Sequence, residues 1–420
     1  MKSQTKLKQT EIGKIPEDWR FEELDKHAKI TMGQSPESSY YNSIRNGTPF
    51  LQGIRTFGDL YPKYDTWTTK VTKFAKKGSL LLSVRAPVGE VNFADQDICI
   101  GRGLMSIDGK NNKFLFYLFK AYKEYVTSKE TGTVYGSVSR DDIAKLQFPF
   151  PRDIEQKSIV KILSDLDSKI ELNQQMNKTL EAIGKAIFKH WFIDFDFPNE
   201  EGKPYKSSGG KMVYNEELGR EVPKGWEVKH FSEVIEVNPK RELPKGKMAK
   251  KVSMSDLNPW QSWIESWVLE EYKSGPRFSN GDTLFARITP SLENGKIAFV
   301  TIMDNNETGF GSTEFIVFSK NVISSNFYIF HLCRTEEIRN TAISAMTGTS
   351  GRQRVPDDLF DYLLITLPPS ILIDKFEKIC SSLFNQIANN AKEIRTLSQI
   401  RDSLLPKLMS GKIRVPVETR

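Results

Sequence analysis

The sequence repeats itself once, and this internal repeat limits the folds that the chain can adopt. Residues 15–19 (IPEDW) recur as residues 222–226 (VPKGW), roughly 200 residues further along the chain. Further pairs of segments follow in the same order: 77–81 with 280–284, 131–133 with 347–349, and 148–151 with 366–369. Units of about 200 residues can each bury a core of their own, which excludes a solenoid of short stacked repeats. We therefore expect a tandem duplication whose halves are related by a pseudo-twofold axis.

Each repeat ends in a long segment with helical periodicity. After Pro151 and again after Pro369, apolar residues recur mostly at intervals of three and four, and each stripe contains one Asn, Asn173 or Asn390. The apolar positions are Ile159, Leu163, Leu166, Ile170, Met176, Leu180, Ile183 and Ile187 in the first segment, and Phe376, Leu383, Ile387, Ile394, Leu397, Ile400, Leu404 and Leu408 in the second. A helix of roughly 35 residues is about 50 Å long, more than the width of a small domain. We therefore expect the two helices to pack on each other, although each could instead cover the core of its own domain.

The residues between each Pro-x-x-Trp opening and its helix have a different composition. Short β-prone runs such as 79–84 and 315–318 alternate with Gly, Pro and Asn turns, which predicts two α+β modules of short strands and helices. Residues 198–221 are polar and rich in Gly, as is typical of a linker. The predicted organisation is a first module over 1–151, a helix over 152–197, a linker over 198–221, a second module over 222–369, and a helix with a tail over 370–420.

No motif for covalent chemistry stands out in the sequence. The chain has no GxxxxGK[ST], HExxH or GxSxG segment, and no GxGxxG segment between a strand and a helix. Asn258-Pro259-Trp260 matches part of an amino-methyltransferase loop but lacks its second Pro, and Glu271-Tyr272-Lys273 matches only the end of a nuclease motif. Asp194 and Asp196 are expected to close a helix end. These patterns predict a chain that is not an enzyme.

The cysteines and the termini limit the remaining possibilities. Cys99, Cys333 and Cys380 lie far apart and the chain has four His, so neither a zinc site nor a disulfide framework is indicated. The N-terminus is polar, without the apolar core of a signal peptide, and no run approaches eighteen apolar residues. We therefore expect a cytoplasmic protein without a metal site.

The residues that recur between the repeats suit binding to DNA. The chain has 60 Lys and Arg against 53 Asp and Glu, a net charge of +7 and a pI near 9.0, which is compatible with a polyanionic partner. Arg residues after strands and Gly, Ser and Thr residues in loops can contact phosphates and base edges. The candidates are Arg55, Arg85, Arg102, Thr133, Tyr135, Ser137 and Arg140 in the first module, and Arg287, Lys296, Thr349, Ser350, Arg352, Gln353 and Arg354 in the second. The loops could instead be Gly-rich turns, and Arg85 and Arg287 could instead form buried salt bridges.

The chain resembles the specificity subunits of type I restriction-modification enzymes over almost all of its length. The resemblance lies in the two Pro-x-x-Trp openings, residues 78–89 (GSLLLSVRAPVG), the Thr-Gly-Thr loops, the helices after Pro151 and Pro369, and residues 404–411 (LLPKLMSG). It implies two target recognition domains that each read one half of a split DNA site. It also implies that the two long helices separate these domains as an antiparallel coiled coil.

The resemblance further implies a division of labour with partner subunits. Two modification subunits would bind S-adenosylmethionine and methylate adenine, and restriction subunits would act as motor and nuclease with ATP and Mg²⁺. This chain would bind double-stranded DNA and none of these cofactors. The alternatives are a standalone DNA nuclease or methyltransferase with an unfamiliar site, and a scaffold whose modules bind nothing.

Overall fold

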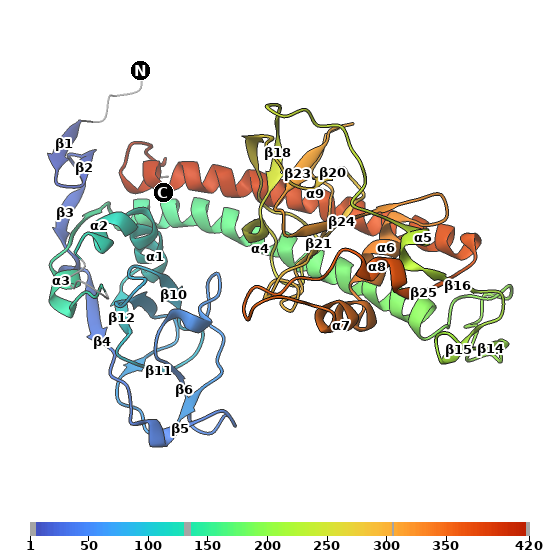
Figure 1. The fold of residues 1–420 in the computed structure, drawn as a ribbon. Coiled ribbons are helices and arrows are strands. Elements are labelled where there is room, and N and C mark those ends of the chain that lie inside the picture. Colours follow the sequence, from blue (N-terminus) through green and yellow to red (C-terminus); the bar gives the residue numbers. More distant parts are fainter. Residues whose placement is uncertain (1–5, 130–135, 305, 417–420) are drawn as a thin grey trace. The chain divides into compact units, whose positions relative to one another are not determined.

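Two compact units make up the protein. The structure is a computed structural model that describes residues 6–129, 136–304 and 306–416. Contacts divide the chain into Met1–Ser168 with Ser398–Arg420, and Lys169–Leu397. The division falls inside the continuous helices α4 (Asp153–Phe188) and α9 (Ser370–Met409) (Figure 1). Each unit therefore contains one α+β module and part of both long helices.

The first unit is built on an antiparallel sheet with the strand order β10-β9-β12-β4, beside a mixed sheet with the order β5-β7-β6-β11-β8. Its strands are β1 (Leu7–Thr10), β2 (Gly13–Pro16), β3 (Arg20–Glu23), β4 (Ala28–Met32), β5 (Tyr41–Asn42), β6 (Thr48–Leu51), β7 (Trp67–Thr68), β8 (Phe74–Ala75), β9 (Leu80–Ser83), β10 (Val91–Phe93), β11 (Ile98–Ile100), β12 (Leu104–Gly109) and β13 (Gln147–Phe150). Its shorter helices are α1 (Asn112–Ala121), α2 (Lys123–Thr127) and α3 (Arg140–Ala144).

Strand β9 explains why its sequence is a continuous apolar run. Leu80 and Leu82 belong to the core cluster that includes α1, whereas Leu81 belongs to a second cluster with Ile98 and Ile100 of β11. All three leucines are fully buried. Because successive side chains of a strand point to opposite faces, a strand between two cores needs apolar residues at every position.

The second unit repeats this architecture. Its sheets have the strand orders β17-β24-β21-β22 and β19-β18-β23-β20, with β18 and β23 parallel like β6 and β11 of the first unit. Its strands are β14 (Met212–Asn215), β15 (Arg220–Pro223), β16 (Glu227–His230), β17 (Ile235–Val237), β18 (Met248–Val252), β19 (Val268–Glu271), β20 (Arg277–Phe278), β21 (Thr283–Ala286), β22 (Ile297–Phe299), β23 (Gly309–Gly311), β24 (Phe315–Lys320) and β25 (Leu364–Leu367). Its shorter helices are α5 (Phe231–Val234), α6 (Asn326–Cys333), α7 (Glu336–Ser344) and α8 (Leu359–Tyr362). The repeat in the sequence is therefore a repeat of strand order.

The segment expected to be a linker, 198–221, contains a hairpin. Strand β14 pairs with β15 so that Met212 faces Pro223, in the same register in which Leu7 of β1 faces Pro16 of β2. The side chains of β14 are exposed or half-buried. Without a buried face, the strand lacks the alternation of apolar residues that reveals strands in a sequence.

Helices α4 and α9 pack against each other in antiparallel directions. Within the first unit, Arg401 Nη1 lies 2.8 Å from Asp167 Oδ1. Within the second unit, Asn173 Nδ2 donates to Glu393 Oε2 at 2.7 Å, and Asn390 Nδ2 donates to Asn177 Oδ1 at 2.8 Å. The residue number in α9 falls as the residue number in α4 rises, so the two helices are antiparallel, as the family resemblance implies.

The buried stripe of α4 differs from the apolar stripe of the sequence at two positions. Met176 and Ile183 are 39% and 43% exposed, whereas Asn177 and Gly184 are buried. The buried residues Leu163, Ile170, Asn177 and Gly184 recur at the seven-residue spacing of a coiled-coil seam. At Gly184, a Cβ atom would lie 3.1 Å from the ring of His331, so the small residue lets α6 approach the helix closely.

Helix α9 shows a similar exchange near its end. Ile400 is exposed, and the neighbouring Arg401 turns toward Asp167 instead. An ion pair thus occupies a part of the contact that the apolar pattern assigned to a hydrophobic side chain. Within the described ranges, no helix combines the length and the apolar character needed to cross a bilayer.

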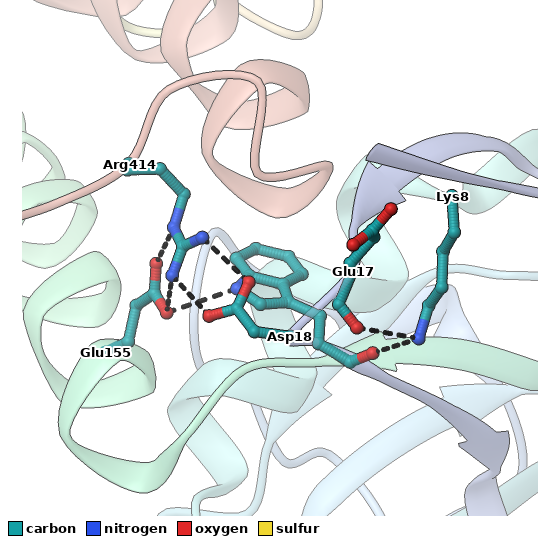
Figure 2. Close-up of polar contacts among 6 residues, drawn as sticks. Lys8, Glu17, Asp18, Glu155 and Arg414 are labelled. Carbon is teal, nitrogen blue, oxygen red and sulfur yellow. Dashed lines mark hydrogen bonds and ion pairs between the residues drawn. The ribbon is translucent and has the colours of Figure 1, made fainter. Parts of the chain in front are cut away.

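An ionic cluster joins the C-terminal segment to the start of the chain within the first unit (Figure 2). Arg414 donates to both carboxylate oxygens of Asp18 at 2.9 Å, and to Glu155 of α4 at 2.7 and 3.0 Å. The indole Nε1 of Trp19 also donates to Glu155, at 3.1 Å. The hydrogen bonds from Arg414 hold the pKa of Asp18 below its usual value. Residues 398–416 are therefore a structural part of the N-terminal unit.

We predict that the buried pair Asn177 and Asn390 behaves as a matched unit. Asn177→Leu or Asn390→Leu alone leaves the other amide group buried without this partner, which should destabilise the protein by about 1–3 kcal/mol. The double substitution removes both polar groups and should cost less than either single change. Urea unfolding of the four proteins measures the coupling, and additive losses in the double variant would contradict it.

Candidate nucleic-acid interface

In each unit, an inner strand of the four-stranded antiparallel sheet leads to an Arg that lies beside a Gly-rich loop. We call residues 136–140 in the first unit and 347–354 in the second the Gly-rich loop of that unit. In the first unit, β9 is followed by Arg85, which forms a β-bridge with Ser137, and Val138 N donates to Val84 O at 3.1 Å. In the second unit, β21 is followed by Arg287, and Val355 N donates to Arg287 O at 2.8 Å. In each unit, these backbone hydrogen bonds thus place the end of the strand beside the loop of the same unit.

The first unit presents two exposed arginines close together. Val84 N donates to Gly103 O at 3.0 Å, which brings the residues next to Arg85 and Arg102 into contact. Both arginines are exposed, and in the described part of the chain their side chains have no hydrogen bond or ion pair. Such side chains keep their full capacity to bind an anionic ligand.

The remaining candidates of the first unit are arranged differently. Arg55 lies in a separate 3-10 turn and forms a salt bridge of 2.7 Å with Asp65. Arg140 begins α3, where its Nε donates to Ile30 O and its Nη1 contacts Asp141. Ser137 is half-buried beside Arg85. Thr133 and Tyr135 lie outside the described residues.

The equivalent Arg of the second unit is committed to the fold. Arg287 Nη1 forms a salt bridge of 2.7 Å with Asp357, and its Nη2 donates to Val355 O at 2.6 Å. This salt bridge is not buried, since the side chains of Arg287 and Asp357 are 19% and 60% exposed. The equivalent position thus carries an ion-paired Arg in the second unit and an exposed Arg85 in the first.

The loop of the second unit combines paired and unpaired residues. Arg354 donates to Glu314 with both Nε and Nη2, and these bonds hold the pKa of Glu314 below its usual value. Gln353 is paired through its backbone with Thr289. Thr349, Ser350 and Arg352 are exposed, and the Arg352 side chain has no hydrogen bond or ion pair in the described ranges. Lys296 lies directly before β22, and its Nζ donates to Met254 O at 2.8 Å.

Trp260 is a candidate for this interface that the sequence analysis did not identify. Its backbone N donates to Gly295 O at 3.1 Å, next to Lys296, and the residue is 51% exposed. Asn258 and Gln261 enclose Pro259 and Trp260. A Trp between two amide residues in a segment without helical or strand periodicity is the sequence signal that could have identified it. Across residues 6–129, 136–304 and 306–416, no group of His, Cys, Asp or Glu is placed to hold a metal ion.

Comparisons with known proteins agree with the resemblance seen in the sequence. The family model of the type I restriction modification DNA specificity domain matches residues 16–182. The specificity subunit of the type I restriction enzyme MjaIX from Methanocaldococcus jannaschii is 28% identical, over 98% of this chain and 97% of that protein. The specificity subunit of the HindI enzyme from Haemophilus influenzae is 24% identical, over 81% of this chain and 88% of its own.

The fold also matches a solved structure along nearly its whole length. The crystal structure of the S subunit of a type I restriction-modification system from M. genitalium covers 96% of this chain and 98% of that chain. The TM-score is 0.58 at 17% sequence identity, so this match supports the fold. The family model over residues 16–182 and the relatives that span the chain therefore make it similar, over nearly its whole length, to the specificity subunits of type I restriction-modification enzymes.

Proposed function

We propose that this chain reads a bipartite DNA site, with one module for each half-site, and directs adenine methylation or DNA cleavage by partner subunits. One observation carries the proposal: the same strand end and loop recur in both units, but with different side chains. A duplicated scaffold with diverged contact residues suits two different half-sites. The cofactors S-adenosylmethionine, ATP and Mg²⁺ would be used by the partners.

The side chains fall into proposed contact and positioning roles. Arg85, Arg102 and Arg352 are exposed and have no side-chain partner among the described residues, and they are proposed to meet phosphates or guanine edges. Arg287 and Arg354 already have carboxylate partners, and we propose that they hold the loop in place. The remaining proposed contacts are Arg55, Thr133, Tyr135, Ser137, Arg140, Lys296, Thr349, Ser350 and Gln353.

The long helices are proposed to set the distance between the half-sites. They extend through both units, and a helix of about 36–40 residues is roughly 54–60 Å long. This is more than one turn of B-DNA, which measures about 34 Å. The base pairs between the half-sites would remain unread.

We propose that α4 also binds a modification subunit. Leu172, Met176 and Ile183 lie within one stripe of the helix and are 50%, 39% and 43% exposed. Exposed apolar side chains in a row suit contact with another helix. We place the complex in the cytoplasm, where it has access to chromosomal DNA.

We predict that Arg352→Ala weakens binding to DNA and lowers its dependence on salt. Loss of one phosphate contact should reduce the slope of log K against log salt concentration by about one. Binding of a duplex over a salt series measures both effects. The matched control is Lys224→Ala, because Lys224 is also exposed, without a side-chain partner in the described chain, and lies in a turn before β16. If both variants have the same slope of log K against log salt concentration, Arg352 does not contact a phosphate and the loop is a structural turn.

A heptad inserted into both helices is expected to lengthen the unread spacer. The insertions are placed after Ser168 in α4 and after Leu397 in α9, where the division between the units crosses each helix. Seven residues add about 10 Å, or roughly three base pairs of B-DNA. Methylation mapping should give the same half-sites with a longer spacer.

An insertion in α4 alone is the control. It shifts the pairing register between α4 and α9 by seven residues beyond the insertion and should impair folding or assembly. If the paired insertions leave the spacer unchanged, the helices do not measure it.

A further inference from the structure

We propose that Trp260 stacks on a nucleobase of the DNA, as a contact of the second module that lies outside its Gly-rich loop. The inference rests on the proposed function and names a ligand chemistry for one residue. Trp260 is one of the exposed large hydrophobic residues of the protein, with 51% of its surface accessible. The residues Asn258 and Pro259 before it are also exposed.

The backbone holds Trp260 in an unusual conformation. Its φ angle is 62°, in the left-handed region that non-glycine residues rarely adopt. Its N–H donates to Gly295 O, and a Cβ atom on Gly295 would lie 2.6 Å from the indole ring. The ring position therefore requires glycine at 295. This arrangement fixes an exposed aromatic ring.

A buried cation lies under one face of the ring. The Arg339 guanidinium is 4.2 Å from the centroid of Trp260, and Arg339 is only 7% exposed. Its Nη2 donates to the carbonyls of Leu292 and Glu293, at 3.4 and 3.3 Å, and its Nε has no hydrogen-bond partner among the residues that the structure describes. No carboxylate in the described chain pairs with it. A charge buried in this way favours an electron-rich or anionic group nearby, and DNA supplies both.

Other contacts anchor the carbonyl of Trp260. Arg334 Nη2 donates to Trp260 O at 2.6 Å, while Arg334 Nη1 forms a salt bridge of 2.8 Å with Glu181 of α4. The segment that starts at Trp260 continues to Trp267. There, the Arg395 guanidinium of α9 lies 4.1 Å from the ring of Trp267. The segment is therefore tied to both long helices within its unit. A contact residue held this way loses little conformational freedom on binding.

The residues beside the ring have polar chemistry. Asn258 Nδ2 donates to Gln261 Oε1 at 3.2 Å and to Glu265 Oε2 at 3.3 Å, and Gln261 Nε2 donates to Glu265 Oε1 at 2.9 Å. The Trp263 indole donates to the same carboxylate at 3.0 Å. An exposed ring among amide groups does not form the contiguous apolar patch of a protein-docking surface. Amide groups next to an aromatic ring are instead typical of sites that recognise bases.

The position of Trp260 links it to the proposed interface. The segment 287–296 contacts the Gly-rich loop at one point, where Thr289 N donates to Gln353 O at 3.0 Å, and contacts Trp260 at another, at Gly295. The loop and the ring thus flank the same short segment. Lys296 is part of this segment, Arg339 donates to its carbonyls at Leu292 and Glu293, and Arg334 donates to Trp260 O.

The test compares variants of the full chain, assembled with its modification subunits, for binding to a duplex that carries the recognised site. Because base–aromatic stacking is typically worth about 1–3 kcal/mol, Trp260→Ala should weaken binding roughly 5- to 150-fold. Trp260→Phe should retain most of the affinity, since it keeps a ring. Tyr214→Ala is the matched control, an exposed aromatic residue of the β14–β15 hairpin in the same unit, and it should leave the affinity unchanged.

A second measurement uses the wild-type protein. Thymines of the duplex are replaced one at a time by 5-iodouracil, irradiated, and the adducts are mapped by mass spectrometry. An adduct on Trp260 at one thymine in or beside the half-site of the second module supports the proposal. Unchanged affinity of Trp260→Ala together with no adduct on Trp260 overturns it.

The outcomes also distinguish this proposal from the proposed function. If the wild-type complex does not bind the duplex, the proposed function fails and the base contact fails with it. If the wild type binds and Trp260→Ala loses a modification subunit in gel filtration while no adduct forms on Trp260, the ring is a protein contact and only the present inference is overturned.

Discussion

The antiparallel packing of α4 and α9 is the constraint on which the rest of the structure depends. Each module is completed by parts of both helices, and the first unit is therefore built from two separate stretches of the chain, 1–168 and 398–420. The Asn177–Asn390 pair and the Asp167–Arg401 ion pair are polar contacts in this packing. Polar groups in an apolar seam fix the register, because any slip would leave them buried without partners.

The two units use different chemistry to join their modules to the helices. In the first unit the junction is ionic: Arg414 connects Asp18 with Glu155. In the second unit, Trp226 occupies the position that Trp19 has in the first repeat. Trp226 packs against Phe192 and Phe195, with ring centroids 6.1 and 5.3 Å away. The ionic junction joins the segment after α9 to residues far away in the sequence, whereas the aromatic junction lies where α4 leads directly into the second repeat.

Much of the fold could be predicted from the sequence, because the repeat and the helical periodicity are strong signals. The phase of the seam could not be predicted, since Met176 and Ile183 are apolar but exposed, while Asn177 and Gly184 are buried through contacts with α9 and α6. The hairpin of β14 and β15 was hidden because β14 has no buried face.

The candidate interface was predictable only in part. Equivalent positions could be aligned, but their roles depend on tertiary partners: Arg85 is exposed, whereas Arg287 pairs with Asp357. Trp260 gained its significance from Arg339 and Gly295, which are distant in the sequence. No local pattern reports such contacts.

The central claim is that two diverged copies of one module read two separate DNA sequences. Single-molecule methylation mapping of a genome that carries this chain with its modification subunits tests it most directly. The account predicts methylated adenines within a bipartite site, formed by two short specific sequences and an unspecific spacer of fixed length. A single uninterrupted recognition sequence, or methylation that does not depend on this chain, would contradict the account.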